Sequence, residues 1–368
     1  MELSQKILKQ LVQIKSYSGR EKKLTDFIMD FCQKNSLPTE KQEGNIIIKF
    51  LVGSKKCLIF NAHLDTVKEG KKSSWTYPPF GKKAGIIKDE KIYGLGASDD
   101  KVSIAVFLSL AMEFIKNSPL IDIFFTFVTK EEIDGSGSQS FVSHFIDNYA
   151  KSYNDVSVII GEPTNCNSIE IGHRGNIFVK VKTTGDSGHS SNPGKIKIKS
   201  IEKMIKIVSK IKSLEKEIKM FYSDDILGCP TICLTGFSSS KSSVNKIPSE
   251  CSTTWDIRTT PLLHDKFMNI LKKKLGKGVE IEMIGKPGNY GLTEKNSKIV
   301  NIFKKIVNDL EIKISPSSND TAFFTSVGIP AVTFGPGNKE SIHKENEYVK
   351  LDNLNKSFSI YKNLINNY

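Results

Sequence analysis

The sequence predicts an α/β fold: a mostly parallel sheet with flanking helices, interrupted by a smaller inserted domain. Three observations carry this prediction. Strand-like apolar runs alternate with helical periodicity through the first part of the chain. The middle part has the order β-α-β-β-α-β, which is the pattern of a ferredoxin-like unit. Helix and strand then alternate again toward the C-terminus, so we expect the main domain to be discontinuous.

The first part of the chain is predicted to contain two helices, then alternating strands and one long helix. A capping-box pattern, Ser18-Gly19-Arg20-Glu21, precedes the second opening helix and predicts where that helix starts. The later elements follow from apolar runs bounded by turn residues. We expect strands at residues 45–50, 56–61, 121–129 and 155–160, and a helix at residues 101–115.

The inserted domain is predicted at residues 174–285, which leaves residues 1–173 and 286–368 for the main domain. Alternating or apolar runs predict four strands in the insert, and helical spacing of apolar residues predicts two helices. The strands are expected at residues 177–183, 231–237, 252–258 and 279–284, and the helices at 201–211 and 267–275. After the insert, a helix at 299–310 and a short strand at 331–334 complete the main domain.

Composition excludes several classes of function. The chain has 368 residues and a net charge of +13, but its lysines are dispersed and no aromatic-rich basic stripe accompanies them. A solvated surface explains this charge, so we expect no nucleic-acid partner. The apolar runs are too short to span a bilayer, and the first residues lack the pattern of a signal peptide. We therefore expect a cytoplasmic protein without a membrane partner.

Candidate chemistry gathers at the ends of the predicted strands. Two histidines and several acidic residues directly follow apolar strands, and two further acidic residues lie in a glycine-rich loop that opens a helix. In a parallel sheet, the loops after the strands meet at one edge, where α/β proteins place their sites. The residues are His63, Asp65, Glu131, Glu132, Glu162 and His343 after strands, with Asp99 and Asp100 in the loop.

Such a cluster requires a positive charge. Each pattern taken singly is common: an isolated pair of acidic residues is usually a solvated surface, and an isolated histidine is usually structural. Together, however, the carboxylates would repel one another strongly without a cation. Imidazole and carboxylate form the ligand set that suits zinc and related divalent ions. The sequence therefore predicts a metal site at this edge of the sheet.

Short motifs along the chain carry a resemblance to a known family. They occur in order from about residue 60 to residue 350 and include His63-Leu64-Asp65, Asp99-Asp100-Lys101, Glu131-Glu132, Gly161-Glu162-Pro163, Gly188-His189-Ser190 and Gly335-Pro336-Gly337. This pattern resembles the acetylornithine deacetylase, succinyl-diaminopimelate desuccinylase and carboxypeptidase G family of dinuclear metallohydrolases. The resemblance implies a zinc-exopeptidase-like catalytic domain and an inserted lid and dimerisation domain.

The resemblance also implies roles in binding two metal ions, most commonly zinc, with cobalt or manganese as alternatives. His63, Asp99 and Glu162 would hold one ion. Glu132, the same Asp99 and His343 would hold the other. Asp65 would orient the ring of His63 by accepting its hydrogen bond, and Glu131 would be the general base.

Further residues would bind the substrate. By resemblance, His189 in the insert reaches the active site of a partner subunit in a homodimer and polarises the scissile carbonyl. Arg258 suits a bidentate grip on a substrate carboxylate, although a surface ion pair is the alternative. Asn245 agrees with a substrate that has a free carboxylate. Gly335 and Gly337 would offer backbone groups to the same small molecule.

Two activities of the same chemistry stay open at this point. The first is hydrolysis of an N-acyl amino acid, of the acetylornithine deacetylase or succinyl-diaminopimelate desuccinylase type. The second is a metallo-exopeptidase, either a dipeptidase or a carboxypeptidase, because the pair Asp100-Lys101 also occurs in dipeptidase branches of the resembled family. Glu162 instead resembles the deacylases and carboxypeptidases. A non-catalytic binding protein is disfavoured, since every expected ligand and the base are present.

Overall fold

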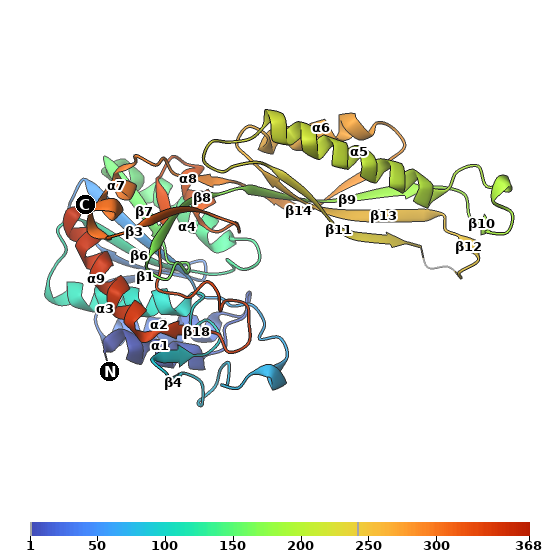
Figure 1. The fold of residues 1–368 in the computed structure, drawn as a ribbon. Helices are drawn as coiled ribbons and strands as arrows, with labels where there is room; N and C mark the ends of the chain where they lie inside the picture. Colours follow the sequence, from blue (N-terminus) through green and yellow to red (C-terminus); the bar gives the residue numbers. More distant parts are fainter. Residues whose placement is uncertain (1, 241–242) are drawn as a thin grey trace. The chain divides into compact units, whose positions relative to one another are not determined.

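The computed structural model describes residues 2–240 and 243–368 (Figure 1). The chain divides into two compact units. The first unit comprises Met1–Gly172, Gly291–Ser315 and Asn319–Tyr368, and the second comprises His173–Tyr290 and Pro316–Ser318. The domain limits expected from the sequence, with the insert at residues 174–285, stay a prediction.

The first unit is built on a nine-stranded sheet whose middle is parallel. Each middle strand runs parallel to its neighbour, and antiparallel strands continue the sheet on both sides. The middle strands are, in spatial order, β6 (Asp122–Val128), β3 (Lys56–His63), β7 (Asp155–Ile160) and β17 (Ala331–Thr333). The flanking strands are β2 (Asn45–Phe50) and β1 (Thr39–Gln42) beyond β6, with β8 (Ser168–His173), β15 (Gly291–Leu292) and β16 (Glu311–Ser315) beyond β17.

Helices cover both faces of this sheet, because neighbouring residues of its strands point to opposite sides. On one face, α3 (Lys101–Lys116) and α9 (Leu351–Asn367) enclose Phe60 and Phe125, whose rings stack with centroids 5.3 Å apart. On the other face, Phe124 packs in a cluster with α4 and α8. Helix α4 spans Ser136–Asn148 and helix α8 spans Thr321–Thr325. Helix α1 (Leu3–Gln13) packs on α3.

Smaller elements complete the first unit. Helix α2 packs against β1 and β2, helix α7 packs against α9, and a separate sheet has the order β18-β5-β4. Their bounds are α2 (Lys22–Lys34), α7 (Lys298–Ile306), β18 (Tyr348–Lys350), β5 (Lys91–Tyr93) and β4 (Ile86–Lys88). Short 3₁₀ turns occupy Lys72–Ser74, Ala150–Ser152, Pro193–Lys195 and His264–Lys266, the last two in the second unit.

The second unit has the predicted β-α-β-β-α-β order. Its four strands form an antiparallel sheet in the order β11-β13-β9-β14, and two helices cover one face around the buried Trp255. Its bounds are β9 (Gly175–Thr184), α5 (Ser200–Phe221), β11 (Thr231–Ser239), β13 (Glu250–Thr259), α6 (Phe267–Leu275) and β14 (Glu280–Gly288). Two strands of two residues each, β10 (Gly188–His189) and β12 (Lys246–Ile247), form a small extra sheet beyond one end of β13 (Figure 1).

The predicted α/β class is confirmed, but several local expectations were wrong, among them the end of α5, which runs to Phe221 instead of residue 211. Ser18 does not cap α2, because its hydroxyl donates to Asp65 Oδ2 at 2.7 Å and the helix begins only after Glu21. Strand β3 runs two residues past the predicted end and includes His63. Helix α7 ends at Ile306 rather than at residue 310. Within residues 2–240 and 243–368, no helix has the length and apolar character needed to cross a membrane.

Helix α3 provides a test of the core. Leu108 is completely buried in this helix, whereas Leu120, just beyond it, is 78% exposed. We expect Leu108→Ala to lower the free energy of unfolding by about 2–5 kcal/mol, because the substitution leaves a cavity. The matched control Leu120→Ala should change that free energy by less than about 0.5 kcal/mol. Urea unfolding followed by circular dichroism measures both, and equal effects would contradict this packing.

Candidate metal centre

Strand register brings the candidate residues to one edge of the sheet. His63 pairs with Val128, the last residue of β6, and Asn61 pairs with Ile160, the last residue of β7. Ile160 in turn pairs with Thr333 at the end of β17. Because these strands are parallel, the segments that follow them all leave the sheet at its carboxyl edge, as the sequence predicted. Those segments carry Glu131, Glu132, Glu162 and His343.

His63 lies at the centre of the buried side of the cluster. Its Nε2 atom is 2.9 Å from Asp99 Oδ1 and 3.5 Å from Glu162 Oε1. Its Nδ1 atom is 2.9 Å from the carbonyl oxygen of Asp65 and 3.5 Å from the carboxylate of the same residue. The ring is therefore oriented mainly by the backbone of Asp65, and Nε2 is left facing two carboxylates.

His343 forms a second group on the more exposed side. Its Nε2 atom is 3.1 Å from Glu132 Oε1 and 3.4 Å from Asp99 Oδ2. The side chain of His343 is 49% exposed, while that of Asp99 is only 7% exposed. Asp99 thus directs one carboxylate oxygen toward each histidine. This arrangement suits a carboxylate that bridges two ions.

The spacing of the remaining atoms fits metal binding. Three possible ligand atoms, one from each side chain, lie within 4.8 Å of one another in the set His63, Asp99 and Glu132. The same limit holds for His63, Glu131 and Glu162. Both sets combine one imidazole with two carboxylates, which is a donor set that zinc and its neighbours accept.

Burial makes the charge of this cluster costly. Burial raises the pKa of Glu162 well above its usual value, and the negative charges of Asp99 and Glu131 raise it further. Burial likewise raises the pKa of Glu131. At Asp99 burial also acts upward, but hydrogen bonds with His343 and His63 outweigh it and lower the pKa. Divalent cations would neutralise this set of acidic groups, so the residues present fit a pair of metal ions.

Asp65 also holds the loop that carries the two glutamates. Its Oδ1 atom accepts the backbone N–H of Glu131 at 3.1 Å, and its Oδ2 atom accepts that of Glu132 at 3.1 Å. Ser18 donates to the same carboxylate. Asp65 therefore ties the segment after β6 to the segment after β3, which is a wider role than orienting His63.

In the second unit, His189 and Asn245 lie together, and Arg258 does not join them. His189 Nε2 is 3.1 Å from Asn245 Nδ2. Arg258 instead donates to Asp256 Oδ2 at 3.0 Å. The β10–β12 pair that carries His189 lies before Glu250, the first residue of β13, and Arg258 follows Glu250 by eight residues on that strand. At about 3.3 Å per residue, Arg258 lies roughly 26 Å along β13 from Glu250, and the other two side chains lie beyond Glu250.

Gly335 and Gly337 pack closely against neighbouring loops. The N–H of Gly335 donates to Thr164 Oγ1 at 3.1 Å, and its carbonyl oxygen accepts the N–H of Thr164 at 3.2 Å. A Cβ at Gly335 would overlap the carbonyl oxygen of Gly161, and one at Gly337 would overlap that of Ser98. For Gly335 the structure thus indicates close backbone packing, because its N–H is already used inside the protein.

Sequence reasoning missed Glu347. This residue is 2% exposed, and its carboxylate accepts the backbone N–H of Asp99 at 3.0 Å. Glu347 lies four residues after the candidate ligand His343, which was the available signal for a role at the site. The neighbouring sequence does not indicate that its partner lies near residue 99. Asp320 received no role either, although its buried carboxylate accepts hydrogen bonds from Asn61 and Ser138.

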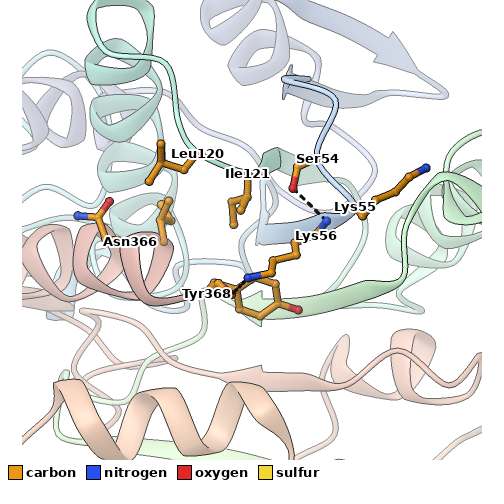
Figure 2. A pocket seen from close by; sticks show the side chains of 8 residues that line it. Ser54, Lys55, Lys56, Leu120, Ile121, Asn366 and Tyr368 are labelled. Atoms are coloured by element: carbon orange, nitrogen blue, oxygen red, sulfur yellow. Dashed lines mark hydrogen bonds between the residues drawn. The ribbon is translucent and has the colours of Figure 1, made fainter.

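A pocket of about 340 Å³ lies elsewhere on the first unit, at the amino ends of the central strands (Figure 2). Lys56, the first residue of β3, donates from Nζ to the carbonyl oxygen of Tyr368 at 2.9 Å there. Leu120 and Ile121 form an apolar side of the pocket. Its lining lacks the combination of imidazole and carboxylate found at the other edge, so the strand-end cluster is the candidate site.

Solved structures of similar fold cover nearly the whole chain. An M20 family metallo-carboxypeptidase from Sulfolobus solfataricus superposes with a TM-score of 0.77 at 21% identity and covers 99% of both chains. A dinuclear metal-binding peptidase of the M20 family from Bacillus subtilis has a TM-score of 0.72 at 14% identity, with 98% of this chain and 96% of that chain covered. These likenesses support the fold described above.

Sequence relatives and a family profile agree with the fold. An acetylornithine deacetylase from Buchnera aphidicola subsp. Schizaphis graminum is 28% identical over 88% of this chain and 84% of its own length. A succinyl-diaminopimelate desuccinylase from Rickettsia rickettsii is 27% identical over 97% of this chain and 98% of its own length. Residues 59–367 match the profile of peptidase family M20/M25/M40. The chain, with its bridging-type carboxylate between two histidines, belongs to this family of amide-bond hydrolases.

Proposed function

We propose that this chain is a dinuclear metal-dependent amidohydrolase that cleaves an N-acyl amino acid. The observation that carries the proposal is the placement of Asp99 between His63 and His343, at 2.9 and 3.4 Å. A carboxylate that directs one oxygen toward each of two imidazoles can bridge two neighbouring ions, each held by one of those imidazoles. We propose zinc for both ions, with cobalt and manganese as alternatives, because each accepts imidazole and carboxylate ligands.

The proposed ligands fall into two sets that share Asp99. His63 and Glu162 complete the first set, and Glu132 and His343 complete the second. When bound, the ions would polarise the scissile carbonyl and lower the pKa of the attacking water. The protein contributes the fixed positions of these side chains, which the register of β3, β6 and β7 supports.

Glu131 is proposed as the general base. It directly precedes Glu132, and burial raises the pKa of its carboxyl group. A carboxylate with a raised pKa can take a proton from the attacking water and later release that proton to the departing amine. The two adjacent glutamates would then divide the work, since one holds a metal ion and the other moves the proton.

The substrate-binding residues support a homodimer. His189 and Asn245 lie beyond Glu250, which is itself roughly 26 Å from Arg258 along the second unit. One small substrate therefore cannot contact all three side chains of a single chain. We propose that Arg258 of one subunit grips the substrate carboxylate, while His189 and Asn245 of a partner subunit reach the scissile carbonyl. Breaking the Arg258–Asp256 ion pair would free the guanidinium for this task.

The names of the sequence relatives favour deacylation. Acetylornithine deacetylase and succinyl-diaminopimelate desuccinylase are the names of relatives aligned over most of this chain. Both names describe removal of an acyl group from an amino acid. The exopeptidase alternative uses the same chemistry on a different acyl group. A cytoplasmic location stays a prediction.

Replacing the proposed base should separate turnover from metal binding. We expect Glu131→Gln to lower kcat by about 10²- to 10⁴-fold, because the amide cannot accept the proton. The protein should still bind two metal ions per chain, as measured by inductively coupled plasma mass spectrometry after dialysis. The neighbouring substitution Glu132→Gln is the matched comparison and should lose one ion. If Glu131→Gln lost an ion instead, Glu131 would be a ligand and not the base.

A mixed dimer tests the contribution of the partner subunit. Glu131→Gln and His189→Ala should each be inactive alone, because each removes one half of every site. Co-expression of the two variants should restore about a quarter of wild-type activity, since half of random dimers are mixed and each of these keeps one intact site. Activity that stays at the level of the single variants would show that His189 acts within its own chain.

A substrate panel tests the acyl preference. Metal-reconstituted protein should hydrolyse N-acetyl- or N-succinyl-amino acids with a kcat/KM about tenfold or more above that for dipeptides, because the preferred acyl group gains transition-state binding. Ninhydrin detection of released amine measures both reactions on the same scale. Methyl esters of the best substrate serve as the control for the carboxylate grip. Faster turnover of dipeptides would select the exopeptidase activity.

A further inference from the structure

Glu347 connects two loops of the metal centre through its carboxylate. Its Oε2 atom accepts the backbone N–H of Gly96 at 2.8 Å. Its Oε1 atom accepts the N–H of Ser98 at 2.7 Å and that of Asp99 at 3.0 Å. A single buried carboxylate therefore satisfies three N–H groups of an irregular loop. Burial and the charge of Asp99 raise the pKa of Glu347 to about 8, while the three N–H groups act to lower it, so the same contact holds the loop and favours the ionised carboxylate.

The backbone around Glu347 strengthens the same connection. The carbonyl oxygen of Glu347 accepts the N–H of Gly94 at 3.0 Å. The hydroxyl of Ser98 donates to the carbonyl oxygen of Tyr348 at 2.6 Å. Strand β18, which begins at Tyr348, then pairs with β5, which ends at Tyr93. The segment after His343 thus runs along the whole loop from Gly94 to Asp99.

Packing below the loop leaves it little freedom to move. Gly96 has a positive φ of 81°, and a Cβ there would lie 2.9 Å from Cδ of Lys101. Lys101 is 1% exposed, and its ammonium group donates to the carbonyl oxygen of Ile14 at 2.7 Å. The stem of Lys101 therefore supports the loop from one side while Glu347 holds its N–H groups from the other.

We propose that Glu347 is a positioning residue that fixes Asp99 relative to His343 and thereby sets the affinity of the ion that these two side chains share. This inference rests on the proposed function, since it takes Asp99 and His343 as ligands. Glu347 lies four residues after His343 and binds the N–H of Asp99 itself. Any movement of this carboxylate changes the separation of the two ligands.

The effect should be selective for one of the two ions. The site of His63 and Glu162 has one ligand that ends β3 and another that follows β7 by two residues, so the sheet holds these two directly. The site of Glu132 and His343 depends on loops, because His343 lies ten residues beyond the end of β17. Loss of the Glu347 contact should therefore loosen the second ion more than the first.

Glu347→Gln tests the proposal with little change in volume. The glutamine NH₂ group must face at least one of the loop's N–H groups, so a donor meets a donor and the loop shifts. We expect the second zinc ion, at Glu132 and His343, to bind about 10- to 100-fold less tightly, with the first ion changed by less than about threefold. Competition with a fluorescent chelator measures both affinities. The absorption spectrum of the cobalt-substituted protein reports the altered coordination without any activity assay.

Asp122→Asn is the matched control. Asp122 is 4% exposed, and its carboxylate also accepts three hydrogen bonds, from the N–H groups of Val52 and Ser54 and from the Tyr153 hydroxyl. It begins β6, at the edge of the sheet opposite the metal centre. This variant should lose thermal stability to a similar extent while both zinc affinities stay within about twofold of wild type, because outer contacts matter only near the ion.

The outcomes distinguish the inference from its premise. If Glu347→Gln and Asp122→Asn both lose stability and both keep wild-type zinc affinities, Glu347 is merely structural and the proposal is wrong. If the wild-type chain does not bind two ions, the proposed function itself fails. Should Glu347→Gln not fold, Ser98→Ala leaves the Glu347 carboxylate in place and removes the hydroxyl's contacts with Tyr348, Asn338 and Ser341. Ser98→Ala should weaken the same ion by a smaller factor, and unchanged affinity in this variant would also overturn the proposal.

Discussion

The rest of the structure depends on holding several like charges together where water is largely absent. Asp99, Glu131 and Glu162 converge on His63, and burial opposes their ionisation at every position. Such a cluster costs free energy unless cations compensate it. The parallel register of the central strands is what forces the encounter, because it delivers successive loops to one edge. The fold therefore creates a repulsion that metal binding would turn into attraction.

Buried carboxylates that accept backbone N–H groups keep the repelling groups in place at both ends of the cluster. Asp65 and Glu347 are carboxylates, yet each uses its oxygens to accept backbone N–H groups of a ligand-bearing loop. Irregular loops leave many N–H groups without partners, and a buried carboxylate satisfies several at once. Side chains that carry negative charge thus stabilise the loops that carry the other negative charges. The ligand-bearing loops are therefore held by these hydrogen bonds as well as by their attachment to the sheet.

Much of the fold could be predicted because its information is local. The apolar runs of β2 and β7 gave their bounds correctly, and the buried helix α3 was one residue longer than expected. The failures involve partners distant in the chain. Ser18 resembled a helix cap, but its hydroxyl binds Asp65. Strand β8 went unpredicted, because its alternating Ile169 and Ile171 are only two apolar residues and its polar residues, which are also buried, do not look like core in the sequence. Glu347 was missed because its three partners lie about 250 residues earlier.

The candidate site divides in the same way. The sequence alone shows which residues directly follow a predicted strand, so the residues around His63 could be grouped from it. The distance between His189 and Arg258 could not, because it depends on how far β10, which carries His189, lies beyond the start of β13 and on where Arg258 lies along that strand. That distance changes the argument about the substrate. Residues that look like one binding set in the sequence become two sets in space, separated by more than the roughly 26 Å from Glu250 to Arg258. Under the proposed function, a small substrate meets both sets only where two chains combine, so one chain would supply the metal ligands and a partner would complete substrate recognition.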